Sequence, residues 1–434
     1  QVRPAHEAKG RTAFAHLFEH MMFQATKHVP EDSFFRTLEA AGASNINGST
    51  SFDYTNYYAT VPANQLELAL WLESDRMGYL LDVVDEASFA NQQDVVRNER
   101  RQRTENSPYG MAEEAMFQLL YPAGHPYHGV VIGSHQDIQA ARLADVKQFF
   151  KEYYAPNNAT LAIVGDFDPQ QVRQLVAKYF GSLKRGTAVP PVKIETPGIA
   201  AERRKVVPSR VELPKVYMAW ITPPFFQPGD ADADITATIL GGGRSSRLYK
   251  KLVYERQIAQ DVSAVQYSTM LGCAFMIDAT ARPGHTVEEL EKAIEEEVAA
   301  LAAQAPEARE VERARNQLLH RARLEGADDS ENQSICADVI LIVALQVRVR
   351  EGGQARLAAI HRAAVRMRNK SRGQKILPEF AAWRSVNAQA PLFHHHRALL
   401  IKLAEHRVPD PVGLHRHPQL DLVLGKRNHV IGEI

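Results

Sequence analysis

Two histidines and a glutamate within five residues, His16-Leu17-Phe18-Glu19-His20, constrain this chain more than any other stretch. Residues four apart on a helix lie one turn above each other on the same face. His16 and His20 can therefore bind one metal ion from the same side. A catalytic zinc usually has three protein ligands and leaves a fourth position to water. Glu19 reaches that side at a different angle, which suits a general base acting on a metal-activated water better than a third ligand.

The residues around this stretch indicate a buried helix. Apolar side chains surround it nearly all round, namely Ala13, Phe14, Ala15, Leu17, Phe18, Met21, Met22 and Phe23. Burying a histidine or a glutamate is costly unless the group is paired or binds a metal. Metal binding is therefore favoured over the alternatives, a solvated face or histidines that bind only the backbone. The order His-x-x-Glu-His also reverses the commoner His-Glu-x-x-His metal motif.

A second helix, predicted over residues 89–105, offers a third ligand. Val95, Val96 and Glu99 are spaced so that Glu99 can share the inward face. The other charged side chains are expected on the solvent side, with Arg101 and Arg103 able to pair with Glu105 or Glu73; this group comprises Asp94, Arg97, Arg100, Arg101 and Arg103. Taken alone, the segment favours the plainer interpretation, in which Glu99 is one more charge on a charged helix.

Together these two stretches resemble the pitrilysin/insulinase family of zinc peptidases, specifically its bacterial half-length, zinc-bearing members. The second stretch is Val-Val-Arg-Asn-Glu-Arg-Arg over residues 95–101. Further matches fall at residues 43–58, 70–77, 154–158, 163–168 and 241–249, so the resemblance covers about residues 10 to 325. It implies one zinc ion held by His16, His20 and Glu99, with Glu19 as general base. The implied activity is hydrolysis of peptide bonds in peptides or small unfolded proteins.

The resemblance also implies an α+β fold of two similar αβ sandwich domains that arise from an internal duplication, with antiparallel-rich sheets each covered by helices. Residues 50–62 alternate and are rich in Thr, Tyr and Phe, which predicts a strand. In the family an edge strand here pairs with an extended substrate. Asn45 and Asn47 lie just before it and could bind the peptide, although loop asparagines are more often turn residues. Glu73, on a helix predicted over residues 66–80, could orient a ligand histidine.

The predicted organisation has four parts. Residues 1–185 form a zinc-binding peptidase domain, 186–205 a Pro- and Thr-rich linker, 206–349 a second homologous domain, and 350–434 an atypical His- and Arg-rich region. Helices near residues 307–325 and 330–347 are expected to close the second domain. The glycines at 241–243 follow a helix and predict a turn, not a phosphate site. The histidine runs at 393–396 and 415–417 lie in a poorly patterned tail, so a second metal site is not expected there.

Two departures from the family bear on function. The chain begins about ten residues before the zinc helix and not with Met, so we expect a processed form or a fragment that lacks the family's opening strands. Active members also complete the site with an Arg and a Tyr from the second half, which stabilise the oxyanion. The matching positions here are Val253 and Gln260. The resemblance therefore implies a homologous partner subunit that supplies the Arg/Tyr pair.

Composition excludes several other classes of protein. The formal net charge is zero, which argues against a nucleic-acid or membrane-surface protein, and no apolar run approaches the length of a membrane span. The two cysteines, Cys273 and Cys336, are too few for a disulfide framework and lack metal-ligand spacing. A bacterial periplasmic or secreted location is favoured over the cytoplasm. The alternative function is a non-catalytic subunit of the same fold that binds substrate or a partner.

Overall fold

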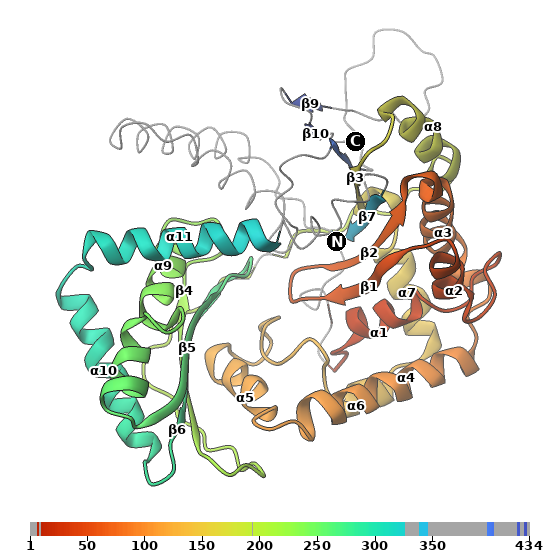
Figure 1. The fold of residues 1–434 in the computed structure, drawn as a ribbon. Coiled ribbons are helices and arrows are strands. Elements are labelled where there is room, and N and C mark those ends of the chain that lie inside the picture. The colour runs from red at the N-terminus through yellow and green to blue at the C-terminus, as the bar shows by residue number, and fades with distance from the viewer. Residues whose placement is uncertain are drawn as a thin grey trace.

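The computed structural model describes residue 7, residues 10–192 and 194–325, and four short strands at 338–345, 397–402, 423–425 and 429–431. Cys336 and the histidine runs at 393–396 and 415–417 lie outside the described residues. The elements form two halves, each with helices packed on a β-sheet (Figure 1). The fold is α+β with predominantly antiparallel sheets, which confirms the predicted class.

The first half contains, in chain order, α1 (Phe14–Met21), α2 (Ser33–Ala40), β1 (Ser44–Thr50), β2 (Thr55–Pro62), η2 (Ala63–Gln65), α3 (Leu66–Tyr79), η3 (Leu80–Asp82), α4 (Glu86–Arg100), the π-helical turn η4 (Arg101–Glu105), α5 (Met111–Leu120), α6 (His135–Ala140), α7 (Leu143–Tyr153), η5 (Pro156–Asn158), β3 (Thr160–Gly165) and α8 (Pro169–Phe180). The second half contains β4 (Lys215–Thr222), α9 (Asp230–Gly241), the π-helical turn η6 (Tyr249–Glu255), β5 (Ala259–Tyr267), β6 (Cys273–Ala281), α10 (Val287–Ala303) and α11 (Ala308–Glu325). The later strands are β7 (Asp338–Leu345), β8 (Arg397–Lys402), β9 (Val423–Gly425) and β10 (His429–Ile431).

The first sheet has the strand order β1-β2-β7-β3-β8-β10-β9. Among the described strands, β1 therefore lies at one edge and pairs only with β2, in antiparallel register. A bulge between Ser44 and Asn47 interrupts that register. Helix α1 contacts β1 on one side and α4 and α7 on others, so the edge strand runs beside the helix with the histidines (Figure 1).

The second sheet has the order β4-β6-β5, with both pairings antiparallel. Helices α9 and α10 pack on it and α11 packs on α9. The succession helix, helix, strand pair, helix, helix occurs in both halves, as an internal duplication requires. The glycines at 241–243 end α9, and a Cβ atom on Gly241 would lie 2.1 Å from the backbone nitrogen of Ala264. The glycine there allows α9 to approach β5 closely, in agreement with the predicted turn.

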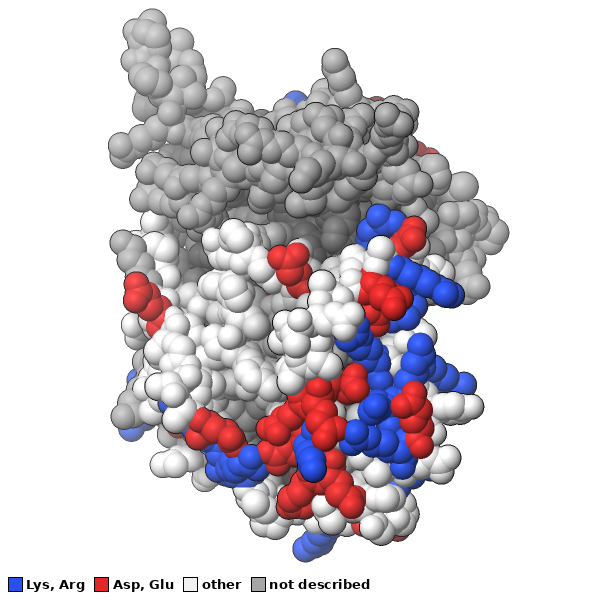
Figure 2. Space-filling view, turned by 90° about the vertical axis from the view of Figure 1, so that its left-hand side faces the viewer, with Lys and Arg blue, Asp and Glu red and all other residues white. Residues whose placement is uncertain are grey.

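The two halves contact each other through an apolar cluster. The cluster contains Phe52 of the β1–β2 turn, Phe117 and Tyr121 of the α5 region, and Tyr267 and Ala274 of the second sheet. The Phe52 ring contacts those of Phe117 and Tyr267. On the outer side of the second half, acidic and basic side chains are interspersed (Figure 2). Ion pairs in this half include Arg256–Glu296. No helix in the described part of the chain is both long enough and apolar enough to cross a membrane.

Two predicted elements are wrong. Residues 50–62 do not form one strand, because residues 51–54 turn the chain between β1 and β2. The described part of the helix predicted over residues 330–347 is instead β7, which lies between β2 and β3 in the first sheet. Its sequence, Asp-Val-Ile-Leu-Ile-Val-Ala-Leu, is a β-branched apolar run that suits a central strand. The four predicted domain limits remain a prediction.

Candidate metal centre

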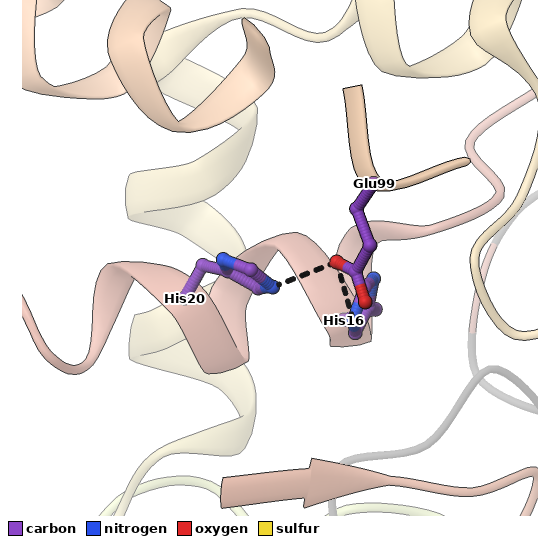
Figure 3. Close-up of side chains that lie close together, drawn as sticks. All are labelled: His16, His20 and Glu99. Atoms are coloured by element: carbon purple, nitrogen blue, oxygen red, sulfur yellow. Dashed lines mark ion pairs between the residues drawn. The ribbon is translucent and has the colours of Figure 1, made fainter. Parts of the chain in front are cut away.

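His16, His20 and Glu99 come together at one point in the structure (Figure 3). One donor atom from each side chain lies within 4.8 Å of the other two. Glu99 Oε2 is 3.2 Å from His20 Nε2 and 3.6 Å from His16 Nε2. The three side chains are 12 to 24% exposed, so solvent reaches the cluster only in part. Within the described residues this is the only group of three or more His, Cys, Asp or Glu with this spacing.

The apolar face of α1 places the two histidines. Leu17, Phe18 and Met21 are fully buried, and the Phe18 ring packs against Phe150 and Tyr154. This face binds α1 to α7. Because the helix repeats every 3.6 residues, positions 16 and 20 are turned toward α4 instead.

A capping box starts the helix that carries Glu99. The Asp85 carboxylate accepts from the backbone N–H of Ser88 at 2.8 Å, and the Ser88 hydroxyl accepts from the backbone N–H of Asp85 at 3.3 Å. Helix α4 then runs beside α1, and Glu99 falls on its last turn. The predicted helix over 89–105 is thus confirmed as far as residue 100, after which the chain continues as a π-helical turn.

The electrostatics of the cluster favour the protonation states that bind a metal. Burial, together with the nearby His20 and Arg103, lowers the pKa of His16 to about 4, so its imidazole is neutral at pH 7. Burial alone would raise the pKa of Glu99, but the imidazoles of His20 and His16 and the charge of Arg103 outweigh it and lower that pKa. Glu99 is therefore a carboxylate beside two imidazoles, and Oε2 is buried without a hydrogen bond among the described residues.

Glu19 lies on the same helix but faces β1. It is 8% exposed, and Oε2 accepts a 2.6 Å hydrogen bond from the hydroxyl of Thr50. Burial raises the pKa of Glu19, and the Thr50 hydrogen bond offsets part of that rise. Gly48 lies against the same carboxylate, since a Cβ atom there would be 3.1 Å from Oε1. Sequence reasoning did not single out Thr50 or Gly48, because β1 is short and polar and lacks an alternating apolar pattern.

The two asparagines predicted to bind a peptide lie on β1 itself and not before the strand. Asn45 adopts a left-handed conformation with φ 50° at the bulge, and Asn47 accepts from the backbone N–H of Gly48 at 2.9 Å. Both are exposed. They are therefore accessible on the edge strand, and peptide binding by them stays a prediction.

The structure does not place Glu73 against a ligand histidine. Its two carboxylate oxygens accept from the buried guanidinium of Arg76, with Nε 2.9 Å from Oε2. Arg76 is 2% exposed and also lies over the rings of Phe34 and Tyr57. A buried arginine needs a counter-charge. The orienting role predicted for Glu73 is corrected accordingly: it neutralises Arg76.

The arginines of the second helix were predicted to face solvent, and for one of them this is wrong. Arg100 is only 5% exposed. Arg103 is exposed but pairs with neither Glu105 nor Glu73. Its Nη1 lies 2.7 Å from Glu99 Oε1, and that leaves Oε2 to face the histidines.

The positions matching the family's Arg and Tyr hold no charged donor. Val253 is buried in the apolar core of the second half, at 8% exposure. Gln260 is an exposed residue of β5, beside the bulge between Ala259 and Asp261.

Two family descriptions match the chain. The model of "Insulinase (Peptidase family M16)" matches residues 5–120, and the "Peptidase M16 inactive domain" matches residues 140–318. Together they cover both halves of the fold, and the first contains the complete candidate metal cluster.

Relatives and solved structures agree with that assignment. The zinc protease PqqE of Helicobacter pylori is 34% identical over 297 residues, which make up 68% of this chain and 66% of PqqE. The crystal structure of a protease from Helicobacter pylori superposes with a TM-score of 0.69 at 30% identity, over 76% of this chain and 79% of that one. The periplasmic protease PqqL of Escherichia coli, at 17% identity and a TM-score of 0.59 over 76% of this chain and 37% of PqqL, shares the fold. The chain belongs to the pitrilysin/insulinase family of zinc proteases, peptidase family M16.

Proposed function

We propose that this chain is the zinc-bearing subunit of an endopeptidase that hydrolyses peptides or small unfolded proteins. One observation carries the proposal: His16 and His20 of one helix meet Glu99 of another. The buried Glu19 directly precedes His20 in the sequence. Relatives that are named zinc proteases support it. The chain spans 66% of the length of PqqE, so activity, substrate and partner are all part of the proposal.

The donor set fits one zinc ion. Two neutral imidazoles and one carboxylate form a three-ligand set of the kind used in catalytic zinc sites. Glu99 Oε2 is buried without a hydrogen bond among the described residues and faces both Nε2 atoms, so a cation there would satisfy it. A zinc ion held by these residues supplies Lewis-acid activation of water and of the scissile carbonyl.

Glu19 is the general base in this proposal. It takes the proton of the attacking water and passes it to the leaving amine. Burial raises its pKa above the usual carboxyl value, which makes the carboxylate a stronger base, and the Thr50 hydroxyl donates to one of its oxygens. An extended peptide would add to the sheet along β1, the edge strand beside Glu19, with Asn45 and Asn47 exposed toward it.

The proposal includes a homologous partner. Val253 is buried and Gln260 is neutral, so these positions offer no charged stabiliser for the oxyanion. We assign that function to an Arg/Tyr pair on a second subunit. A periplasmic or secreted location, like that stated for PqqL, is part of the same proposal.

The test is the zinc content of the purified chain, measured by atomic emission after gel filtration. One zinc per chain is expected for the unaltered protein, and close to none for Glu99→Gln, because a neutral amide is a poor zinc ligand. Glu86→Gln is the matched control, since Glu86 is an exposed residue of the same helix. Full zinc in Glu99→Gln would place the third ligand elsewhere. An unaltered chain without zinc would favour a non-catalytic binding subunit instead.

A further inference from the structure

The distances between the three candidate ligands depend on the separation of two helices. His16 and His20 lie on α1, and Glu99 lies on the last turn of α4. A metal site requires its ligand atoms to be held within about 0.5 Å of the productive geometry. Helix α4 also ends just there and changes to the π-helical turn η4, a distortion often found at functional sites. The contacts that hold this end of α4 therefore bear directly on the site.

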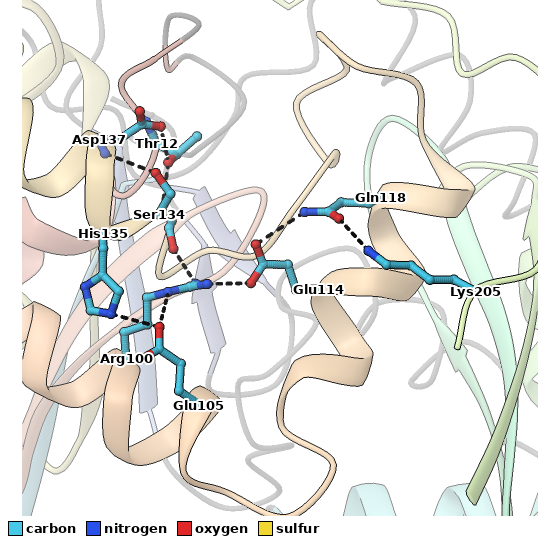
Figure 4. A network of polar contacts seen from close by, with 10 residues as sticks. Thr12, Arg100, Glu105, Glu114, Gln118, Ser134, His135, Asp137 and Lys205 are labelled. Atoms are coloured by element: carbon cyan, nitrogen blue, oxygen red, sulfur yellow. Dashed lines mark hydrogen bonds and ion pairs between the residues drawn. The ribbon is translucent and has the colours of Figure 1, made fainter. Parts of the chain in front are cut away.

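Arg100, which follows Glu99 directly, is bound by three different segments (Figure 4). Its Nη2 donates to Glu114 Oε2 of α5 at 2.6 Å, and its Nη1 donates to the backbone carbonyl of Gly133. Its Nε lies 3.4 Å from Glu105 Oε1, at the end of η4. A buried guanidinium that loses its partners is strongly destabilising, because an uncompensated charge is left away from water. These contacts therefore fix the backbone next to Glu99.

The loop that binds Arg100 also holds the start of α1. A Cβ atom on Gly133 would lie 2.6 Å from the backbone nitrogen of Ala13, so the two backbones are in direct contact. The backbone N–H of Ser134 donates to Thr12 Oγ1 at 3.1 Å. Thr12 in turn donates to Asp137 Oδ2 from its hydroxyl at 2.6 Å and from its N–H at 3.1 Å (Figure 4).

We infer that Arg100 is a positioning residue for the metal centre: with residues 133–137, which end the loop before α6 and form its first turn, it holds Glu99 of α4 at the correct separation from His16 and His20 of α1. The inference rests on the proposed zinc site. A second contact, between His135 Nε2 at the start of α6 and Glu105 Oε1 at 2.8 Å, links the same segment to η4. Arg100 touches none of the three ligands by a hydrogen bond or ion pair among the described residues, so it acts through the backbone of Glu99.

The test is the zinc dissociation constant, measured by competition with a chromogenic chelator. Arg100→Gln is expected to raise it about 10- to 100-fold, the usual effect of losing a residue that supports a metal ligand. Arg100→Lys keeps the charge but cannot span three acceptors. Its zinc dissociation constant should lie between those of the unaltered chain and Arg100→Gln. Arg101→Gln is the matched control. It removes the same charge one residue further on, where, among the described residues, the side chain hydrogen-bonds Asn98 alone, and should leave the zinc dissociation constant unchanged.

A second measurement separates positioning from a general loss of structure. In a Glu99→Gln background, Arg100→Gln should cause no further loss of metal affinity, because the ligand through which it acts is already gone. With Co²⁺ in place of zinc, Arg100→Gln should change the visible absorption of the bound ion, and Arg101→Gln should not. If Arg100→Gln does not fold, Glu114→Ala, which removes one partner of Arg100, should raise the dissociation constant about tenfold, the lower end of that effect.

Equal zinc affinity of Arg100→Gln and the unaltered chain would overturn the inference while the proposed function stands. Equal losses in both backgrounds would overturn it too, since they would show a global effect. Unchanged affinity in Glu114→Ala has the same consequence. Failure of the unaltered chain to bind zinc would instead overturn the proposed function, and the inference with it.

Discussion

Glu19 keeps one carboxylate oxygen on Thr50 and leaves the other, Oε1, without a hydrogen bond among the described residues. His16 and His20 differ from it in facing Glu99 and not β1. Adjacent positions on one helix thus point at different neighbours, and burial raises the pKa of Glu19 while it lowers that of His16. Both shifts have one cause: low-dielectric surroundings disfavour the charged form, which is the carboxylate of Glu19 and the imidazolium of His16.

At this scale we predict that Glu19→Gln keeps its zinc and loses activity. Peptide turnover should fall by a factor of about 10² to 10⁴, the usual contribution of a general base. Zinc content and turnover of a fluorogenic peptide are measured on the same preparation, with a partner subunit present if the chain alone is too slow. Glu39→Gln, at an exposed position of α2, serves as the control. Turnover near that of the unaltered protein would exclude Glu19 as the base.

Among the elements, β1 has the most unusual composition for its position. Its sequence, Ser-Asn-Ile-Asn-Gly-Ser-Thr, has one large apolar side chain, and Gly48 lets the strand approach α1 closely. A Cβ atom at position 48 would lie 3.0 Å from Glu19 Cγ and 3.1 Å from a ring carbon of Phe23. The contact with α1 therefore leaves little room for a side chain at position 48. The same strand provides Thr50, whose hydroxyl donates to the Glu19 carboxylate.

We predict that Gly48→Ala slows peptide turnover about tenfold while zinc content stays at one per chain. The added methyl group must displace Glu19 or Phe23, and overpacking of this kind costs about 1 to 3 kcal/mol. Gly198→Ala is the matched control, because a Cβ atom there meets nothing within 4 Å. Unaltered turnover in Gly48→Ala would mean that the position of Glu19 tolerates this contact.

For the whole molecule, the turn of the β1–β2 hairpin binds the second half. Asp53 accepts from the backbone N–H of Met270 at 2.9 Å and from the hydroxyl of Tyr127, and that hydroxyl accepts from the N–H of Leu271 at 3.1 Å. With the apolar cluster around Phe52, these contacts couple the edge strand beside Glu19 to the second sheet. The second half thus supports the site without contributing a charged donor from position 253 or 260.

We therefore predict that the chain alone binds zinc but cleaves peptides slowly. The loss of one oxyanion donor commonly costs a factor of about 10² to 10³ in rate. Turnover of a fluorogenic peptide should rise on addition of a homologous subunit that carries the Arg/Tyr pair. A partner in which that Arg is replaced by Met is the control and should not restore the rate. Full activity of the isolated chain, unaffected by any partner, would contradict the prediction.

The parts of the site that depend on local geometry could be predicted from the sequence. His16, Glu19 and His20 are placed by one helix whose apolar positions dictate which face is buried, so their spacing was enough. The same holds for the turn at residues 241–243 and for most helices and strands of the second half, because each is specified by the residues of its own segment. Local spacing was not enough to identify Glu99 as a ligand. Its own segment favoured a solvent-exposed charge, and only the family resemblance predicted that it binds the same metal as the histidines.

The tertiary structure alone decided the rest, because the outcome depends on segments far apart in the chain. Arg100, Arg101 and Arg103 are alike in sequence, yet Glu114 and Gly133 bury only the first, and Glu99 takes the third. The position of β7 between β2 and β3, and of β1 at the edge, likewise follows from strand pairing. The sequence by itself determined which side chains can bind a metal, since helical periodicity is local. Packing between α1, α4 and residues 133–137 at the start of α6 decided that these side chains meet, because the spacing of residues within one helix does not specify which distant segment packs against it.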